Sequence, residues 1–145
     1  MTLDELRQYC DGEFESIDKV VHELQALYSQ EKQSYTVAEQ ASLATFIMNA
    51  YSGMENALKN MLLYDKLDIE DSPGWHEKVL KKSGEIGILP PELFQLLTKY
   101  LAFRNYFIYS YVFTIQWEEM RPLVEGMKDV VDQVRAEVNE YLQTI

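Results

Sequence analysis

One charged residue, Arg104, lies in the most hydrophobic stretch of the sequence, LAFRNYFIYSYVF, which runs from Leu101 to Phe113. An arginine side chain stays charged near neutral pH, and removing it from water costs free energy unless the charge is compensated. Arg104 must therefore pair with an acid, lie at a solvated interface, or take part in chemistry. The structural alternative is an ion pair with a buried carboxylate, for which Glu55 is the candidate, that only fixes the register of two helices.

The residues after Arg104 have spacings that bear on a shared pocket. In a helix of 3.6 residues per turn, Tyr111 returns to nearly the same face as Arg104. Asn105 and Tyr109 form a second pair at four-residue spacing. Arg104 and Tyr109 are about 140° apart round an ideal helix. They can converge only on a pocket that is built across two helices or two subunits.

Glu55 raises the same question with the opposite charge, because it lies on the apolar side of its predicted helix, in NAYSGMENALKN. Gly53 beside it would allow another helix to approach closely. Glu55 either supports a pocket with Arg104 or forms a surface ion pair with Lys59, four residues further on. The sequence leaves both alternatives open.

The remaining reactive side chains form no recognisable site. His76 is expected to face solvent or to cap a short helix, and His22 to pack or to lie on the surface. The two histidines show no metal-ligand spacing, so we expect neither a metal nor a cofactor. Motifs for phosphate loops, serine nucleophiles and zinc proteases are absent from the sequence. The single cysteine, Cys10, cannot form an internal disulfide and is expected to be a small core residue of an intracellular protein.

Aromatic side chains are concentrated between residues 100 and 117. One side of one helix cannot bury all eight of them: Tyr100, Phe103, Tyr106, Phe107, Tyr109, Tyr111, Phe113 and Trp117. Part of this surface is therefore expected to face a second chain, which favours a homodimer.

Length and charge restrict the classes of function. The 145 residues fit one domain, 1–145, and 47% of them are hydrophobic, as in a folded protein. The net charge of −11 repels phosphate backbones on average, so an RNA site would have to be a local basic spot. We find no secretion signal, and no window approaches the roughly 18 apolar residues that span a membrane. A cytoplasmic protein without membrane contact is expected.

The spacing of apolar residues, mostly three and four, predicts an all-α protein. Thr2 with Glu5 and Thr36 with Glu39 form predicted capping boxes, and the prolines at 90 and 91 open another helix. The predicted helices cover about 3–30, 36–66, 75–86, 91–113, and 118 or 122 to 142. The third is expected to stop at Gly84 or Gly87, and residues 67–74 are expected to form a surface loop. Four long helices and a short one predict an antiparallel up-and-down bundle.

Three segments in this order, MNAYSGMENALK, GWHEKVL and LAFRNYFIYSYVFTIQWEEMRPLVE, resemble the HEPN superfamily. The similarity is to HepT-like ribonuclease toxins that pair with minimal nucleotidyltransferase antitoxins. It covers about Ile47 to Glu125, and the predicted helices agree with the HEPN-like fold.

The resemblance assigns roles to three residues. The family signature is Arg, four residues, His, one residue, Tyr; Arg104 and Tyr111 match it, but Tyr109 occupies the histidine position. In active members, the arginine and histidine of two subunits meet at the dimer interface and cleave RNA without metal, the arginine stabilising phosphate charge and the histidine moving a proton. A tyrosine, with an ordinary pKa of about 10, cannot replace that base near neutral pH. It can still donate a hydrogen bond to phosphate.

Several functions follow from this departure. The favoured one is a toxin component that is a ribonuclease by descent. Its catalytic set would be Arg104, Asn105 and Tyr109, and Tyr109 in place of the histidine would impair cleavage. The alternatives are a slow nuclease, an engineered silencing of a toxin, a non-catalytic scaffold for a nucleotidyltransferase, and a plain helical adaptor dimer. The resemblance also implies that the nucleotidyltransferase partner attaches AMP to Tyr111.

Overall fold

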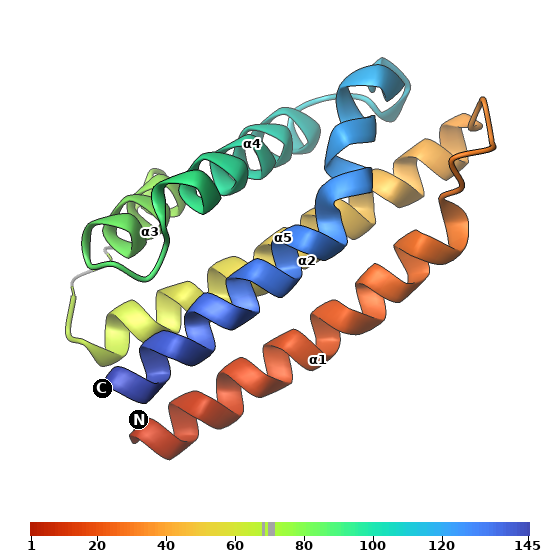
Figure 1. The fold of residues 1–145 in the computed structure, drawn as a ribbon. Helices are drawn as coiled ribbons and strands as arrows, with labels where there is room; N and C mark the ends of the chain where they lie inside the picture. Colours follow the sequence, from red (N-terminus) through yellow and green to blue (C-terminus); the bar gives the residue numbers. More distant parts are fainter. Residues whose placement is uncertain (68, 70–71) are drawn as a thin grey trace.

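The computed structural model describes residues 1–67, 69 and 72–145, and these form a helical bundle without strands (Figure 1). The all-α prediction is confirmed. The elements of the described residues are α1 (Leu3–Leu27), α2 (Val37–Tyr64), α3 (Trp75–Glu85), α4 (Pro91–Ile108), the 3-10 helix η1 (Val112–Thr114) and α5 (Trp117–Thr144). The four long helices alternate in direction, and both termini lie at the same end (Figure 1). Positions 68, 70 and 71 of the predicted loop lie outside the described residues.

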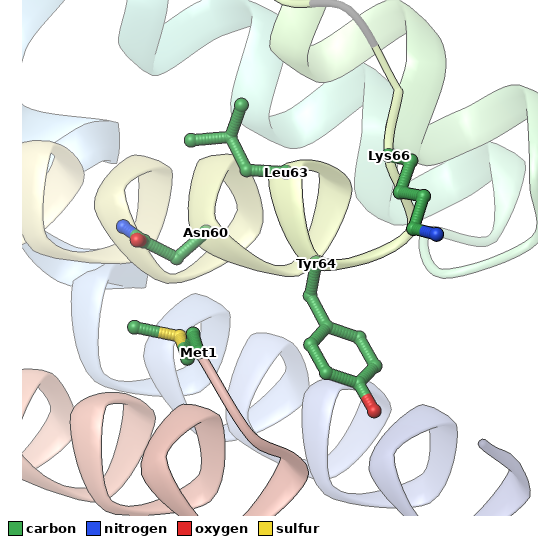
Figure 2. A pocket seen from close by; sticks show the side chains of 5 residues that line it. All are labelled: Met1, Asn60, Leu63, Tyr64 and Lys66. Atoms are coloured by element: carbon green, nitrogen blue, oxygen red, sulfur yellow. The ribbon is translucent and has the colours of Figure 1, made fainter.

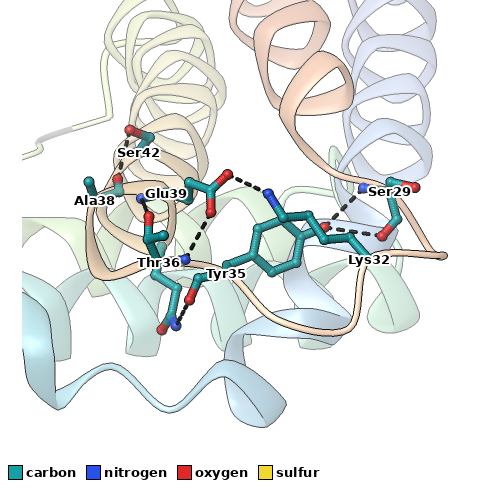
Figure 3. Close-up of polar contacts among 8 residues, drawn as sticks. Ser29, Lys32, Tyr35, Thr36, Ala38, Glu39 and Ser42 are labelled. Atoms are coloured by element: carbon teal, nitrogen blue, oxygen red, sulfur yellow. Dashed lines mark hydrogen bonds and ion pairs between the residues drawn. The ribbon is translucent and has the colours of Figure 1, made fainter.

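The first two helices begin at the predicted capping boxes. The hydroxyls of Thr2 and Thr36 each accept a hydrogen bond, at 3.1 Å, from the backbone N–H three residues on. Figure 3 shows the start of α2, where the Thr36 N–H donates to the Glu39 carboxylate at 2.8 Å and Glu39 also pairs with Lys32. Tyr35 fixes the preceding loop because its hydroxyl donates to the Ser29 carbonyl at 3.1 Å. Local sequence therefore sets where α1 and α2 begin.

The central helix is α2, which packs against α1, α3, α4, η1 and α5. Twelve of its residues are buried, and they cover a broad face of the helix. Gly53 permits the close contact with α1, since a Cβ at that position would lie only 2.6 Å from Cγ1 of Ile17. A polar side chain in the middle of α2, such as Glu55, must find its partner within the protein.

The turn between α3 and α4 depends on one glycine. Gly87 has a φ of 87°, which a side chain would disfavour. The N–H groups of Ile88 and Leu89 both donate to the carbonyl of Ser83, at 2.9 and 3.1 Å. Pro91 then occupies the first turn of α4, where its missing N–H costs no hydrogen bond. This turn brings α4 back along α3 toward α2.

The predicted extension of α4 to residue 113 is wrong, because the helix ends at Ile108. The Tyr109 N–H bonds the Tyr106 carbonyl at 3.3 Å, which tightens the last turn. The Ser110 hydroxyl also donates to that carbonyl, at 2.6 Å, so side chain and backbone compete for one acceptor. Tyr111 is extended, with a φ of −79° and a ψ of 143°. Tyr111 therefore does not share a helical face with Arg104.

Candidate functional site

Glu55 is buried in α2, with 2% of its surface exposed, and its partner is His76. One carboxylate oxygen, Oε1, lies 2.6 Å from the ring nitrogen Nδ1 of His76, which belongs to the first turn of α3. The expected pairing of Glu55 with Arg104 and the alternative pairing with Lys59 are both wrong. The ammonium group of Lys59 instead lies over the ring of Trp75, 4.1 Å from its centre. The buried carboxylate thus gains the partner that its burial requires.

His76 is not the solvent-facing or capping residue that the sequence suggested. Its side chain is 16% exposed, and α3 has no side-chain cap. Its ring lies against Trp75, with 3.7 Å between ring centres. When Glu55 is ionised, Nδ1 must carry the hydrogen, because a carboxylate only accepts. The neutral ring then keeps a lone pair on Nε2 for a proton from elsewhere.

Two buried polar atoms near this pair have no hydrogen-bond partner among the described residues: Oε2 of Glu55 and the hydroxyl of Tyr51. Tyr51 lies one turn before Glu55 on α2. Burial, and then the Glu55 carboxylate, raise the pKa of Tyr51 far above its usual value, whereas the Arg104 guanidinium acts in the opposite direction. The Tyr51 hydroxyl is therefore neutral, and the charges of Glu55 on α2 and Arg104 on α4 act on it in opposite directions.

Arg104 and Asn105 connect α4 to α3 beside the histidine. Arg104 Nη1 donates to Asn105 Oδ1 at 3.0 Å, and Asn105 Nδ2 donates to Glu77 Oε1 at 3.4 Å. Glu77 directly follows His76. Arg104 is half-buried and forms no ion pair with a described residue. Its positive charge is consequently available to an anion at the surface.

We call the residues Tyr51, Glu55, His76, Glu77, Arg104 and Asn105 the polar cluster. Three helices contribute to it: α2, α3 and α4. The sequence singled out Glu55, Arg104 and Asn105, and missed the contribution of α3. The usable signal for His76 was the buried position of Glu55, because a buried carboxylate demands a donor.

Tyr109 and Tyr111 lie apart from the polar cluster within one chain. Their side chains are 88% and 74% exposed, and neither hydroxyl bonds a described residue. The ring of Tyr111 stacks on Phe113, with 5.4 Å between centres. They belong to an exposed apolar patch, here called the aromatic surface, that consists of Tyr106, Ile108, Tyr109, Tyr111, Val112 and Phe113. Among the described residues, no hydrogen bond connects the Tyr109 side chain to the polar cluster.

The pocket in Figure 2 lies elsewhere, near the C-terminal end of α2. It has a volume of about 640 Å³ and is lined by Met1, Asn60, Leu63, Tyr64 and Lys66. Among these lining residues, Lys66 has the charged side chain (Figure 2). The pocket shares no residue with the polar cluster. Among the described residues, no three His, Cys, Asp or Glu side chains are grouped to hold a metal ion.

Fold and cluster together define a class: an antiparallel helical bundle with an arginine and a carboxylate–imidazole pair on adjoining helices. The family model described as HepT-like protein matches residues 42–145, and the chain belongs to this family. The matched region holds every residue of the polar cluster and the aromatic surface. No curated protein and no solved structure matches the sequence. No helix in the described part of the chain is long and apolar enough to cross a membrane.

Proposed function

We propose that this protein is the toxin-like component of a toxin–antitoxin pair, a metal-independent endoribonuclease by descent whose cleavage is impaired by Tyr109. Membership of the HepT-like family is the observation that carries the proposal. Its partner would be a minimal nucleotidyltransferase, and both would act in the cytoplasm. The active form would be a homodimer with the RNA site at the interface.

Arg104 supports an RNA site in an acidic protein. The net charge of −11 repels RNA at long range. A half-buried guanidinium without an ion-pair partner among the described residues can still bind one phosphate, since its rigid fork matches phosphate oxygens. Asn105 holds that fork by accepting from Nη1 at 3.0 Å. Two such arginines across a two-fold axis would form the local basic spot that an RNA site needs.

The aromatic surface supports the homodimer. Phe113 is 70% exposed and Tyr109 is 88% exposed, and they lie within the same connection between α4 and α5. Burying such side chains against a second copy would remove them from water, which stabilises association. A dimer formed there would also carry Tyr109 of one subunit toward the arginine of the other. This supports a composite site, as the family resemblance implies.

Tyr111 supports regulation by the nucleotidyltransferase. A hydroxyl on a 74% exposed side chain, outside any helix, is accessible to an enzyme that transfers AMP. The chain retains this residue although the signature histidine is replaced. That combination favours a second candidate function, a non-catalytic scaffold that binds and is modified by the nucleotidyltransferase. The two candidates differ in whether RNA is cleaved.

An RNA-cleavage assay in the presence of chelator tests the proposal. We expect slow cleavage by the native chain and cleavage about 100-fold faster by Tyr109→His, because an imidazole is restored at the signature position. Adding Arg104→Ala to that variant should abolish the gain. As a control, Tyr64→His adds the same imidazole at the C-terminal end of α2, outside the polar cluster and the aromatic surface, and should leave the rate unchanged. If no chain cleaves RNA, the nuclease proposal fails and the scaffold function replaces it.

A further inference from the structure

We propose that His76 is the proton carrier for the residual cleavage by the native chain, which lacks the signature histidine, and that Glu55 positions it. This inference rests on the proposed function, since it concerns the same reaction. The observation behind it is the juxtaposition, between three helices of one subunit, of a buried carboxylate, an imidazole and an arginine without an ion-pair partner among the described residues. The sequence motif does not include His76.

The Glu55–His76 pair has the geometry of an oriented base. Glu55 Oε1 is 2.6 Å from Nδ1, so an ionised Glu55 fixes the tautomer with the lone pair on Nε2. The ring of Trp75 covers the imidazole from one side, at a centre distance of 3.7 Å. The remaining 16% exposure leaves part of the ring at the surface. A base held in this way needs no reorganisation when a substrate arrives.

Hydrogen bonds connect the arginine to the residue that follows this base on α3. Asn105 accepts from Arg104 and donates to Glu77, the residue that follows His76. The other histidine of the chain, His22, is exposed on α1 and has no part in this arrangement.

The proposed step conserves atoms and protons. Nε2 of neutral His76 takes the proton of a ribose 2′-hydroxyl, and the 2′-oxygen forms a bond to phosphorus. The bond between phosphorus and the 5′-oxygen breaks, and the 5′-oxygen takes a proton from water. The products are a 2′,3′-cyclic phosphate and a 5′-hydroxyl. The imidazolium then returns its proton to the solvent, while the Arg104 guanidinium stabilises the negative charge on the phosphate oxygens.

The decisive variant is His76→Asn. The Asn amide can occupy the position of Nδ1 and still donate to Glu55, but it lacks the nitrogen that moves the proton. We expect cleavage to fall roughly 100-fold or more, with thermal unfolding close to that of the native chain. His22→Asn makes the same chemical change on α1 and should leave cleavage unchanged.

A comparison of kcat with KM separates a chemical role of the pair from a structural one. Glu55→Gln keeps an acceptor for Nδ1 and so keeps the ring oriented, but it removes the negative charge beside the imidazole. We expect kcat to fall while KM and the thermal unfolding temperature stay close to those of the native chain. A purely structural pair would instead lower the unfolding temperature.

The outcomes distinguish this inference from the proposed function. If the native chain cleaves RNA and His76→Asn cleaves equally well, His76 is not the proton carrier, and the nuclease function stands. The same conclusion holds if only Tyr109→His cleaves and His76→Asn does not slow it. If neither the native chain nor Tyr109→His cleaves, the nuclease function fails and the inference fails with it.

Discussion

At the scale of single residues, the polar cluster shows how a charge in an apolar helix is accommodated. Glu55 is compensated by an imidazole from the next helix, and Arg104 by a neutral amide. An amide acceptor orients a guanidinium without cancelling its charge. The carboxylate therefore has its hydrogen-bond partner within the protein, whereas the charge of the arginine stays available at the surface. This asymmetry is what a phosphate-binding site requires.

Two buried tyrosines offer a test of hydrogen-bond satisfaction at this scale. The hydroxyl of Tyr100 donates to the Leu123 carbonyl at 2.7 Å, whereas the hydroxyl of Tyr51 has no partner among the described residues. Tyr100→Phe should lower the free energy of unfolding by about 1 kcal/mol, and Tyr51→Phe should change it little. Urea denaturation of both variants measures the difference. An equal loss would mean that the Tyr51 hydroxyl bonds Glu55.

The sequence predicted that Glu55 and Arg104 needed partners but assigned the wrong ones. Helical spacing describes which residues of one helix share a face, and it indicated Lys59 for Glu55. The true partner, His76, is 21 residues away, on a helix whose placement depends on packing against α2. Asn105 was paired with Tyr109 by spacing, whereas in the structure its side chain accepts from Arg104 and donates to Glu77. Long-range pairs of this kind follow only from the fold.

At the scale of elements, helix starts were more predictable than helix ends. The capping boxes at Thr2 and Thr36 are local, and both form as predicted. The end of α4 depends on a competition in which the Ser110 hydroxyl and the Tyr109 N–H share the Tyr106 carbonyl. Apolar periodicity continues through this point, so pattern alone extends the helix too far. The consequence was a wrong face for Tyr111.

Two helical glycines provide the prediction for this scale. In α2, a Cβ at Gly53 would lie 2.6 and 2.8 Å from side-chain atoms of Ile17 in α1, whereas nothing lies within 4 Å of one at Gly12. Gly53→Ala should lower the free energy of unfolding by roughly 1–3 kcal/mol through overpacking. Gly12→Ala should raise it by roughly 0.5–1 kcal/mol, because alanine favours the helix. Thermal and chemical denaturation measure both. Equal effects would show that α1 does not approach α2 closely at Gly53.

At the scale of the whole molecule, the net charge bears on nucleic-acid binding, and the exposed apolar side chains bear on assembly. The excess of acids repels nucleic acid in general, which leaves recognition to a local site. The aromatic surface lies at the connection between α4 and α5, away from the end where both termini meet (Figure 1). The family match spans this connection. The proposed assembly surface and the signature position at Tyr109 thus lie in the same segment.

Phe113→Ser tests assembly through the aromatic surface. Replacing a 70% exposed phenylalanine removes apolar area that a second copy would cover, so we expect a dimer to dissociate into monomers. Leu63→Ser is the matched control, since Leu63 is 46% exposed near the far end of α2. Sedimentation velocity at several concentrations measures the mass. A native chain that is monomeric throughout would contradict the interface, as would a dimer that survives Phe113→Ser.

The contact between Trp75 and His76 has an optical consequence. An imidazolium ring quenches tryptophan emission more strongly than a neutral ring, and these two rings are 3.7 Å apart. The second tryptophan, Trp117, lies instead against Tyr35, with 4.6 Å between centres. With Trp117 replaced by phenylalanine, the intrinsic fluorescence of the chain would report the charge of His76 directly. The protein thus contains its own indicator for the proton that the reaction would move.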